Sequence, residues 1–284
     1  MPFDLEYVMK KFLLATVALS ALAAAPAVAA DLAARPYTKA PAMIPAPIYN
    51  WTGFYIGGNA GYGFSDRDTI TTTGQVLANV NNVNLGARPG SVNLSRDGFV
   101  GGGQIGYNWQ TSPNFVFGLE ADIAYTDFNR STTINTFPIG GAAPTLVNTF
   151  NSKLEYLGTV RGRLGYTWGA TMLYGTGGFA YGGVDNSASF FGPAGNLQFV
   201  GRDRTTKTGY TVGGGIEHMF TPNWSVKAEY LYYDLGSSNV NVAVIPLPVG
   251  QGGGTGYNTN FRNDGHIVRA GLNYKFGGPV LSQY

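Results

Sequence analysis

The residues that could do chemistry in this 284-residue chain are few and far apart. The chain has no cysteine, which rules out a disulfide framework, thiolate metal ligands and a cysteine nucleophile. Its two histidines, His218 and His266, fall at opposite ends of the predicted strands, and neither has a serine-plus-carboxylate set on its own face. A histidine-activated nucleophile needs such partners, and two separated histidines are a poor ligand set for a metal. We therefore predict a protein that is not an enzyme and that holds no cofactor and no metal.

One stretch matches a cofactor motif in its letters only. Residues 101–106, GGGQIG, fit the dinucleotide-binding fingerprint. That fingerprint binds a cofactor only where a strand precedes it and a helix follows it. Here the letters lie inside a predicted strand, where glycine permits curvature and close strand packing. We therefore predict no nucleotide site.

Charged side chains form the remaining candidate site. Only 12% of the residues are charged, and ten of these lie on predicted strands at positions opposite to the aromatic ones. The ten comprise five acids and five bases: Glu120, Asp122, Glu155, Arg161, Arg163, Glu217, Lys227, Glu229, Arg269 and Lys275.

Eight segments of alternating character must position these charges. A period of two is typical of strands, and each segment is close to the roughly 10 residues that a tilted strand needs to cross a bilayer. The fifth segment is so rich in glycine that its facing is ambiguous. The segments are 53–64, 98–109, 115–128, 153–168, 171–184, 207–220, 224–235 and 266–276.

The connections between these segments alternate in length. Three are short: 110–114, 169–170 and 221–223. Four are long and rich in Asn, Thr, Ser and Gly: 65–97, 129–152, 185–206 and 236–265. This alternation predicts an all-β fold, an eight-stranded antiparallel transmembrane β-barrel with long external loops and short periplasmic turns. A soluble barrel is the alternative, but it would place its apolar side chains inside.

A barrel of this size explains why the charges share a face. On the lipid side, Arg or Lys at mid-bilayer would cost about 2–4 kcal/mol, whereas balanced charges in a narrow lumen can pair. We predict that the ten residues form an ion-pair network that fills the lumen, because eight strands leave an interior that side chains just fill. A charged conduction path is the alternative.

The first 50 residues differ from the rest. Lys10 and Lys11 precede an apolar run, and small residues then precede Asp31, which predicts a signal peptide over residues 1–30. Residues 1–8 are unusual before such a signal, so Met9 is an alternative start. Four prolines in residues 31–50 predict an extended periplasmic linker. The barrel domain is then predicted over 51–284, in the outer membrane.

The two ends of the barrel domain carry a family resemblance. Residues 51–62, WTGFYIGGNAGY, and 268–276, VRAGLNYKF, resemble the first and last strands of the OmpA-like eight-stranded barrels. More narrowly, they are similar to outer-membrane surface antigens and haemin-binding proteins of alphaproteobacteria. The resemblance implies an abundant envelope protein with a structural role. Because some members of the family bind haem, it also implies that this chain is a candidate for haemin binding.

Partners follow from these expectations. We expect outer-membrane lipid, lipopolysaccharide and the outer-membrane assembly machinery as partners. A net charge of +2 gives no sign of a nucleic-acid partner. If haemin binds, it needs an axial ligand such as His or Tyr. His266 at the external rim, with Tyr257 nearby, is then the candidate pair; the alternative is a rim histidine that bonds to its neighbours.

Overall fold

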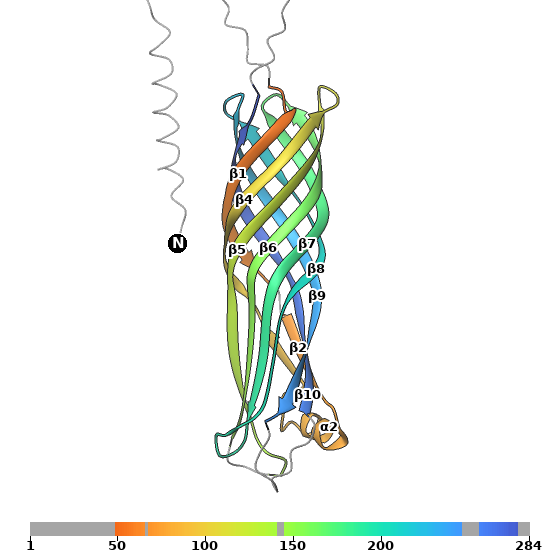
Figure 1. Cartoon of the computed structure of the whole chain (residues 1–284), viewed down its shortest axis with the longest axis vertical. Helices are drawn as coiled ribbons and strands as arrows, with labels where there is room; N and C mark the ends of the chain where they lie inside the picture. The colour runs from red at the N-terminus through yellow and green to blue at the C-terminus, as the bar shows by residue number, and fades with distance from the viewer. Residues whose placement is uncertain (1–48, 66–67, 141–144, 246–255, 278–284) are drawn as a thin grey trace, which may run out of the picture. The chain divides into compact units, whose positions relative to one another are not determined.

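In the computed structural model, residues 49–65, 68–140, 145–245 and 256–277 are described. Eight strands among them form a closed antiparallel ring, because β1 pairs with both β4 and β10 (Figure 1). Ala60 at the middle of β1 lies opposite Gly101 on one side and Ala270 on the other. The strands of the ring are β1 (Gly53–Phe64), β4 (Asp97–Gln110), β5 (Phe115–Thr136), β6 (Leu146–Trp168), β7 (Thr171–Phe191), β8 (Leu197–Met219), β9 (Trp224–Val244) and β10 (Gly256–Lys275).

The predicted facing of the strands is confirmed. Large apolar side chains project outward from the ring, among them Ile56, Phe117, Leu164 and Leu272. Inward positions alternate with them and are buried, as the strict alternation along β5 shows. Exposed apolar groups outside and buried charges inside are the arrangement that a lipid environment requires.

The long connections differ from the prediction. Six strands, β5 to β10, run well beyond their predicted external ends, and the described parts of segments 129–152, 185–206 and 236–265 are largely strand rather than loop. β6 and β8 each have 23 residues, whereas about 9–11 are enough to cross the bilayer. The excess is rich in Thr, Asn and Ser, which predicts loop by composition. Its alternation and cross-strand pairing nevertheless make it strand.

Beyond the membrane the ring opens into two facing layers, which stay connected by a short pairing of β8 with β9 at Phe199 and Val200. β8 pairs with β9 at Val200 and again from Tyr210, but Gly201–Gly209 has no ladder partner on β9. On the other side, β4 begins only at Asp97, and the hairpin of β2 (Asp68–Gly74) and β3 (Ser91–Leu94) pairs with β10 instead. The external part therefore comprises β5–β6–β7–β8 facing β9–β10–β2–β3.

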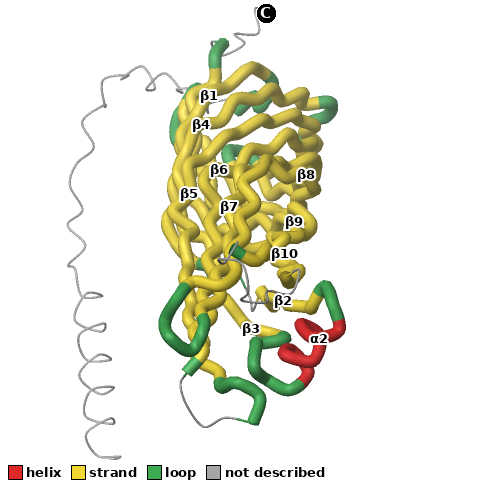
Figure 2. Tube along the Cα trace, turned by 60° about the horizontal axis from the view of Figure 1, so that its bottom comes forward, coloured by secondary structure: helices red, strands yellow, loops and turns green. Residues whose placement is uncertain are grey.

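The hairpin and a short helix close the external end. The helix α2 (Leu77–Asn84) connects β2 to β3, and Figure 2 shows all three beside the external end of β10. An apolar core lies between the two layers, with Phe150 and Phe190 from one and Ile70, Val240 and Tyr257 from the other. Segment 65–97, predicted as a loop, thus fills the external mouth of the barrel.

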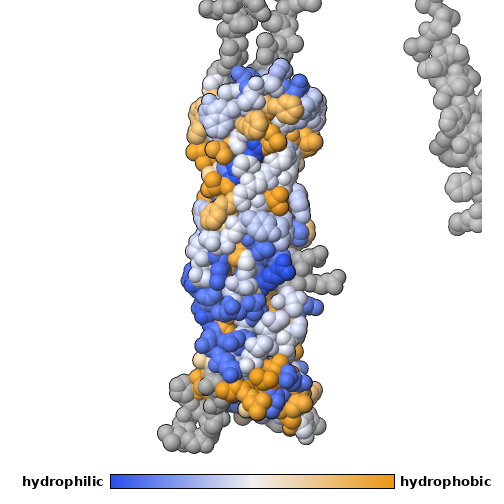
Figure 3. All heavy atoms as spheres, turned by 90° about the vertical axis from the view of Figure 1, so that its right-hand side faces the viewer, coloured by the Kyte–Doolittle hydropathy of each residue, from blue (hydrophilic) through white to orange (hydrophobic). Residues whose placement is uncertain are grey.

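The surface reflects this division. Figure 3 shows apolar side chains around the part of the wall nearest the tight turns, and a hydrophilic band beyond it toward the α2 end. In the described residues, no helix is both long enough and apolar enough to cross a membrane. The predicted signal peptide and most of the linker lie outside the described residues, so those boundaries remain predictions.

Candidate functional site: the charged lumen

A fully buried arginine stands at the centre of the lumen. Nη2 of Arg161 donates to Glu120 Oε1 at 2.5 Å and to Asp122 Oδ2 at 2.9 Å. Nη1 donates to Glu229 Oε1 at 3.0 Å. One guanidinium from β6 therefore joins carboxylates from β5 and from β9, across the whole width of the barrel.

Two more cations complete the central group. Arg269 on β10 donates from Nε to Glu229 Oε2 at 2.7 Å and from Nη1 to Asp122 Oδ1 at 3.1 Å. Lys227 Nζ donates to both oxygens of Glu120, at 2.9 and 3.0 Å. Each carboxylate is thus shared between cations, which is the condition under which buried charges are stable.

A second group lies toward the tight turns. Arg163 donates to Glu217 Oε2 at 2.6 Å and to the Tyr55 hydroxyl at 2.8 Å. Its guanidinium lies 4.1 Å from the centre of the Tyr174 ring. Glu217 also accepts from Ser225 at 2.6 Å. This group joins the central one through Glu120, which is 3.4 Å from Arg163.

Strand periodicity and register explain why these residues meet. Residues two apart on a strand share a face, so Glu120 with Asp122, and Arg161 with Arg163, both point inward. Across the strands, Glu120 lies directly opposite Arg161, and Arg269 lies opposite Glu229. Opposite charges at directly paired positions are the favourable arrangement.

The structure brings eight of the ten predicted residues together and leaves two outside. Glu155 is wrongly assigned to the lumen: the ladder is irregular between Leu154 and Tyr156, and Glu155 instead bonds to Arg204 on the outer surface. A bulge of this kind changes the face that a side chain takes. Lys275 is also outside the network, because it lies at the end of β10 and donates to the carbonyl of Asn50.

Sequence reasoning missed the neutral partners of the network. The hydroxyl of Tyr55 donates to Glu120 at 2.7 Å, and that of Tyr174 donates to Glu229 at 2.9 Å. Nδ2 of Asn59 donates to Gln104 Oε1 at 2.9 Å. Tyr55, on the opposite face from its neighbours Phe54 and Ile56, carried the signal: an aromatic residue with a hydroxyl at an inward position.

Apolar layers bound the charged network on both sides. Toward the tight turns, Trp51 packs with Val116, Met172 and Met219. Toward the external end of the barrel, a buried cluster includes Leu157 and Leu154. Along the inner face of β6, charge therefore gives way to an apolar layer, and the lumen is filled by side chains rather than lined by them.

The two residues proposed for haemin do not come together. Tyr257 is completely buried in the external core, where its hydroxyl accepts from Asn82 at 3.1 Å. His266 lies nine positions along the same strand, about 30 Å away, on the outer wall. There it bonds to the Tyr230 hydroxyl at 2.7 Å and stacks on Phe64. The paired site is therefore wrong, and His266 is a rim residue bonded to its neighbours.

The second histidine, His218, also bonds to a neighbouring side chain on the outer wall. His218 lies near the tight turns on the outer wall, with its Nδ1 2.9 Å from Thr171 Oγ1. Within the described part of the chain, no three His, Asp or Glu residues are grouped so that they could hold a metal.

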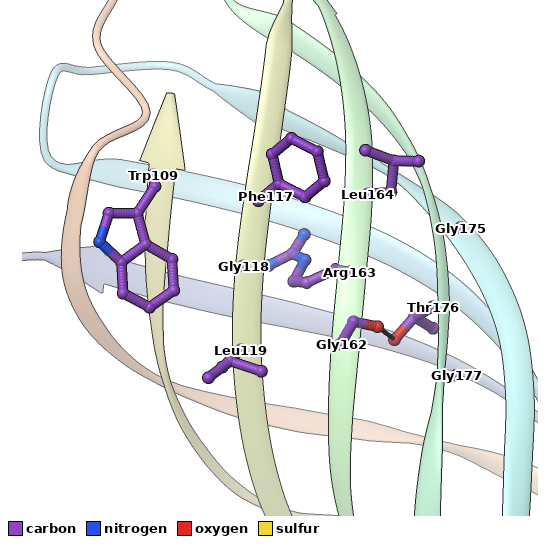
Figure 4. A pocket seen from close by; sticks show the side chains of 10 residues that line it. All are labelled: Trp109, Phe117, Gly118, Leu119, Gly162, Arg163, Leu164, Gly175, Thr176 and Gly177. Carbon is purple, nitrogen blue, oxygen red and sulfur yellow. Dashed lines mark hydrogen bonds between the residues drawn. The ribbon is translucent and has the colours of Figure 1, made fainter. Parts of the chain in front are cut away.

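A hollow of about 670 Å³ lies on the outer wall over β5, β6 and β7 (Figure 4). Trp109, Phe117 and Leu164 surround it, and glycines such as Gly162 form its floor. Thr176, which also lines it, donates to the Gly162 carbonyl at 2.9 Å. Since the rest of the lining is mostly apolar, the hollow fits hydrocarbon rather than a polar substrate.

Comparison with known proteins agrees with this geometry. The model of the family described as outer membrane protein beta-barrel domain matches residues 14–276. The 31 kDa outer-membrane immunogenic protein of Brucella melitensis is 40% identical, over 94% of this chain and all of that protein. The 22 kDa outer membrane protein of Rhizobium leguminosarum bv. viciae is 30% identical, over 69% of this chain and 70% of its own length.

Among solved structures, the outer membrane protein OprG of Pseudomonas aeruginosa aligns over 81% of this chain and 99% of its own, with a TM-score of 0.45 and 15% identity. The family model spans the whole ring of strands, and two curated relatives are named outer-membrane proteins. The chain belongs to the outer membrane protein β-barrel domain family and is an outer-membrane protein.

Proposed function

We propose that the chain is a non-enzymatic structural component of the outer membrane. In this proposal its filled barrel contributes to the integrity of the envelope, and its external two-layered extension makes contacts at the cell surface. The observation that carries the proposal is the lumen: eight mutually paired charges lie between two apolar layers. An interior filled in this way supports a structural role better than a transport role.

The expected partners are those of an integral envelope protein. The apolar outer wall fits the hydrocarbon of the membrane, and the hydrophilic band beyond it fits the lipopolysaccharide layer. Insertion requires the outer-membrane assembly machinery. Several curated relatives are named immunogenic outer-membrane proteins, which supports exposure of this chain at the surface as well.

Deleting the gene tests the structural role. We expect deletion cells to become more sensitive to detergent and to large antibiotics, and the wild-type gene to restore resistance. A version carrying Arg161→Ala, which breaks the lumen network, should restore resistance only in part. Unchanged sensitivity after deletion would contradict the role in integrity.

Protease treatment of whole cells tests the surface contacts. Cleavage is expected within residues 65–97 or 236–265, which lie at the external end. Cleavage confined to the tight turns at 111–114, 169–170 and 220–223 would mean that the barrel has the opposite orientation.

A further inference from the structure

Three cations stand on the outer wall just beyond the aromatic side chains of the external rim. We call Lys153 on β6 and Arg202 and Arg204 on β8 the rim cation cluster. Asp185 on β7 lies opposite Lys153 on one side and opposite Arg204 on the other. Asp185 is four residues beyond the rim tyrosine Tyr181 on β7. Lys153 and Arg204 lie at the same height, because each pairs with Asp185 across a strand.

This height corresponds to the headgroup layer. Four strand residues span about 13 Å, or about 10 Å along the membrane normal at a tilt near 40°. The polar part of each leaflet is roughly 5–8 Å thick in an ordinary bilayer. Side chains as long as arginine therefore reach the level of lipid phosphates from these positions.

Two carboxylates beneath the cations hold them in place. Arg202 donates from Nε to Asp185 Oδ1 at 2.8 Å, and Nη2 of Arg204 donates to both oxygens of Glu155, at 3.0 and 2.9 Å. The arginine side chains are 62% and 63% exposed, against 12% for Asp185 and 26% for Glu155. The acids are thus covered and the guanidinium groups face outward with unused N–H donors.

A fourth cation lies nearby on β8. Lys207 is 3.9 Å from Asp203, and its side chain is partly exposed. It lies in the stretch from Gly201 to Gly209, which has no ladder partner on β9. Charged residues on such a stretch discourage pairing with another strand.

The opposite side of the rim carries more acidic than basic residues. The sector of β4, β5, β9 and β10 includes Asp97, Asp127, Asp234 and Asp264, against Arg130 and Arg262. The sector of β6–β8 includes four cations against Glu155, Asp185 and Asp203. Attraction for an anion is therefore confined to β6–β8.

We propose that the rim cation cluster binds the phosphate groups of an anionic lipid headgroup in the outer leaflet. This inference rests on the proposed function, because it requires the barrel to sit in that membrane. It identifies the phosphate groups as the part of the lipopolysaccharide layer that binds, and β6 and β8 as the strands that bind them.

Binding of bisphosphorylated lipid A to the refolded full chain in detergent, followed by native mass spectrometry, tests the site. Arg202→Gln with Arg204→Gln should weaken binding at least about tenfold, because two charge-assisted bonds are lost. The matched control, Arg130→Gln with Arg262→Gln, should leave binding unchanged. Equal binding by both double variants would overturn the proposal.

Three further arms keep the result specific. Lipid A without phosphates should bind equally weakly to wild type and to Arg202→Gln with Arg204→Gln. A preserved difference between the two proteins would overturn the phosphate assignment.

Millimolar inorganic phosphate should not displace lipid A. Full displacement would mean a free-phosphate site instead. Asp185→Asn with Glu155→Gln should bind at least as tightly as wild type, since the cations are then released; weaker binding would indicate a merely structural cluster.

Folding and function are checked separately. Each variant should show the same shift between boiled and unboiled protein on a gel as wild type. Planar-bilayer recording tests the filled lumen independently: steady channels would contradict the proposed function, whereas loss of lipid A selectivity alone would contradict only the headgroup site.

Discussion

Arg161 and Glu120 lie directly opposite each other on neighbouring strands, and their side chains meet at 2.5 Å in the middle of the barrel. Both side chains are almost completely shielded from solvent. The same guanidinium also bonds to Asp122 and Glu229, so one residue links three carboxylates. Glu120 in turn pairs with Arg161, Arg163 and Lys227, so these two residues are the central pair of the network.

Arg161→Ala should destabilise the barrel strongly. Removing one partner of a buried ion pair leaves uncompensated charge and typically costs about 3–5 kcal/mol. We expect a loss of that size in the free energy of unfolding, measured by urea titration of refolded protein in lipid vesicles. The control is Val160→Ala on the adjacent outward position, which should cost much less. Comparable losses for the two variants would contradict the network.

A pair of glycine substitutions tests the packing inside the wall. A Cβ on Gly63 would lie 1.9 Å from Cζ of Phe128, whereas a Cβ on Gly175 would have no atom within 4 Å. Gly63→Ala should therefore cost about 1–3 kcal/mol through overpacking, and Gly175→Ala should cost little. The same urea titration measures both, and a reversed order would show that Phe128 does not pack there.

Arg88 is expected to hold the β2–β3 hairpin in the external mouth. Its guanidinium donates to Asn148 Oδ1 at 2.8 Å, to the Phe191 carbonyl at 3.0 Å and to Gln198 Oε1 at 3.0 Å. Burial lowers the pKa of Arg88, and no carboxylate pairs with it within the described residues.

Arg88→Ala should release the hairpin and speed protease cleavage within residues 77–90 of the folded protein. Arg202→Ala on β8, which removes an exposed ion pair worth about 0–1 kcal/mol, is the control. Cleavage at the same rate in both variants would mean that the pairing of β2 with β10 holds the hairpin by itself.

Acid should destabilise the external part of the barrel by protonating Asp185. Its hydrogen bond from Arg202, together with the positive charge of that group, lowers the pKa of Asp185. A lowered carboxyl pKa stabilises the folded state above the unfolded value of about 3.9, and this contribution is lost as the pH falls through the folded pKa. NMR titration of the carboxyl carbon should give a lower midpoint in wild type than in Arg202→Gln. Equal midpoints in the two proteins would contradict the ion pair between Asp185 and Arg202.

Alternation was enough to predict the ring and most of the lumen. Inward positions such as Glu120 and Arg161 follow from parity alone, since each strand keeps its phase through the membrane. Glu155 could not be placed in this way, because the irregularity after Leu154 breaks the phase and is not visible in the residue types. The external extension was hidden as well, since Thr-rich and Asn-rich strands resemble loops in composition.

The hairpin of β2 and β3 depends on distant contacts. Thr72 lies 3.4 Å from Thr259, and β2 pairs with β10, nearly 190 residues away along the chain. β3 alternates strictly but has only four residues, and β2 is mostly threonine, so neither gives a clear strand signal by itself. Pairing of this range is specified by the assembled barrel, and sequence reasoning on one segment at a time does not reach it.

Planar-bilayer recording of the refolded full chain tests the filled lumen most directly. The alternative is a small-solute porin, in which Arg161, Arg163, Glu120 and Glu229 would line an open path. We predict silence, or rare and small conductance steps, for wild type, and more frequent openings for Arg161→Ala with Glu120→Ala. Large, steady channels in wild type, with a conductance that these substitutions leave unchanged, would contradict the account.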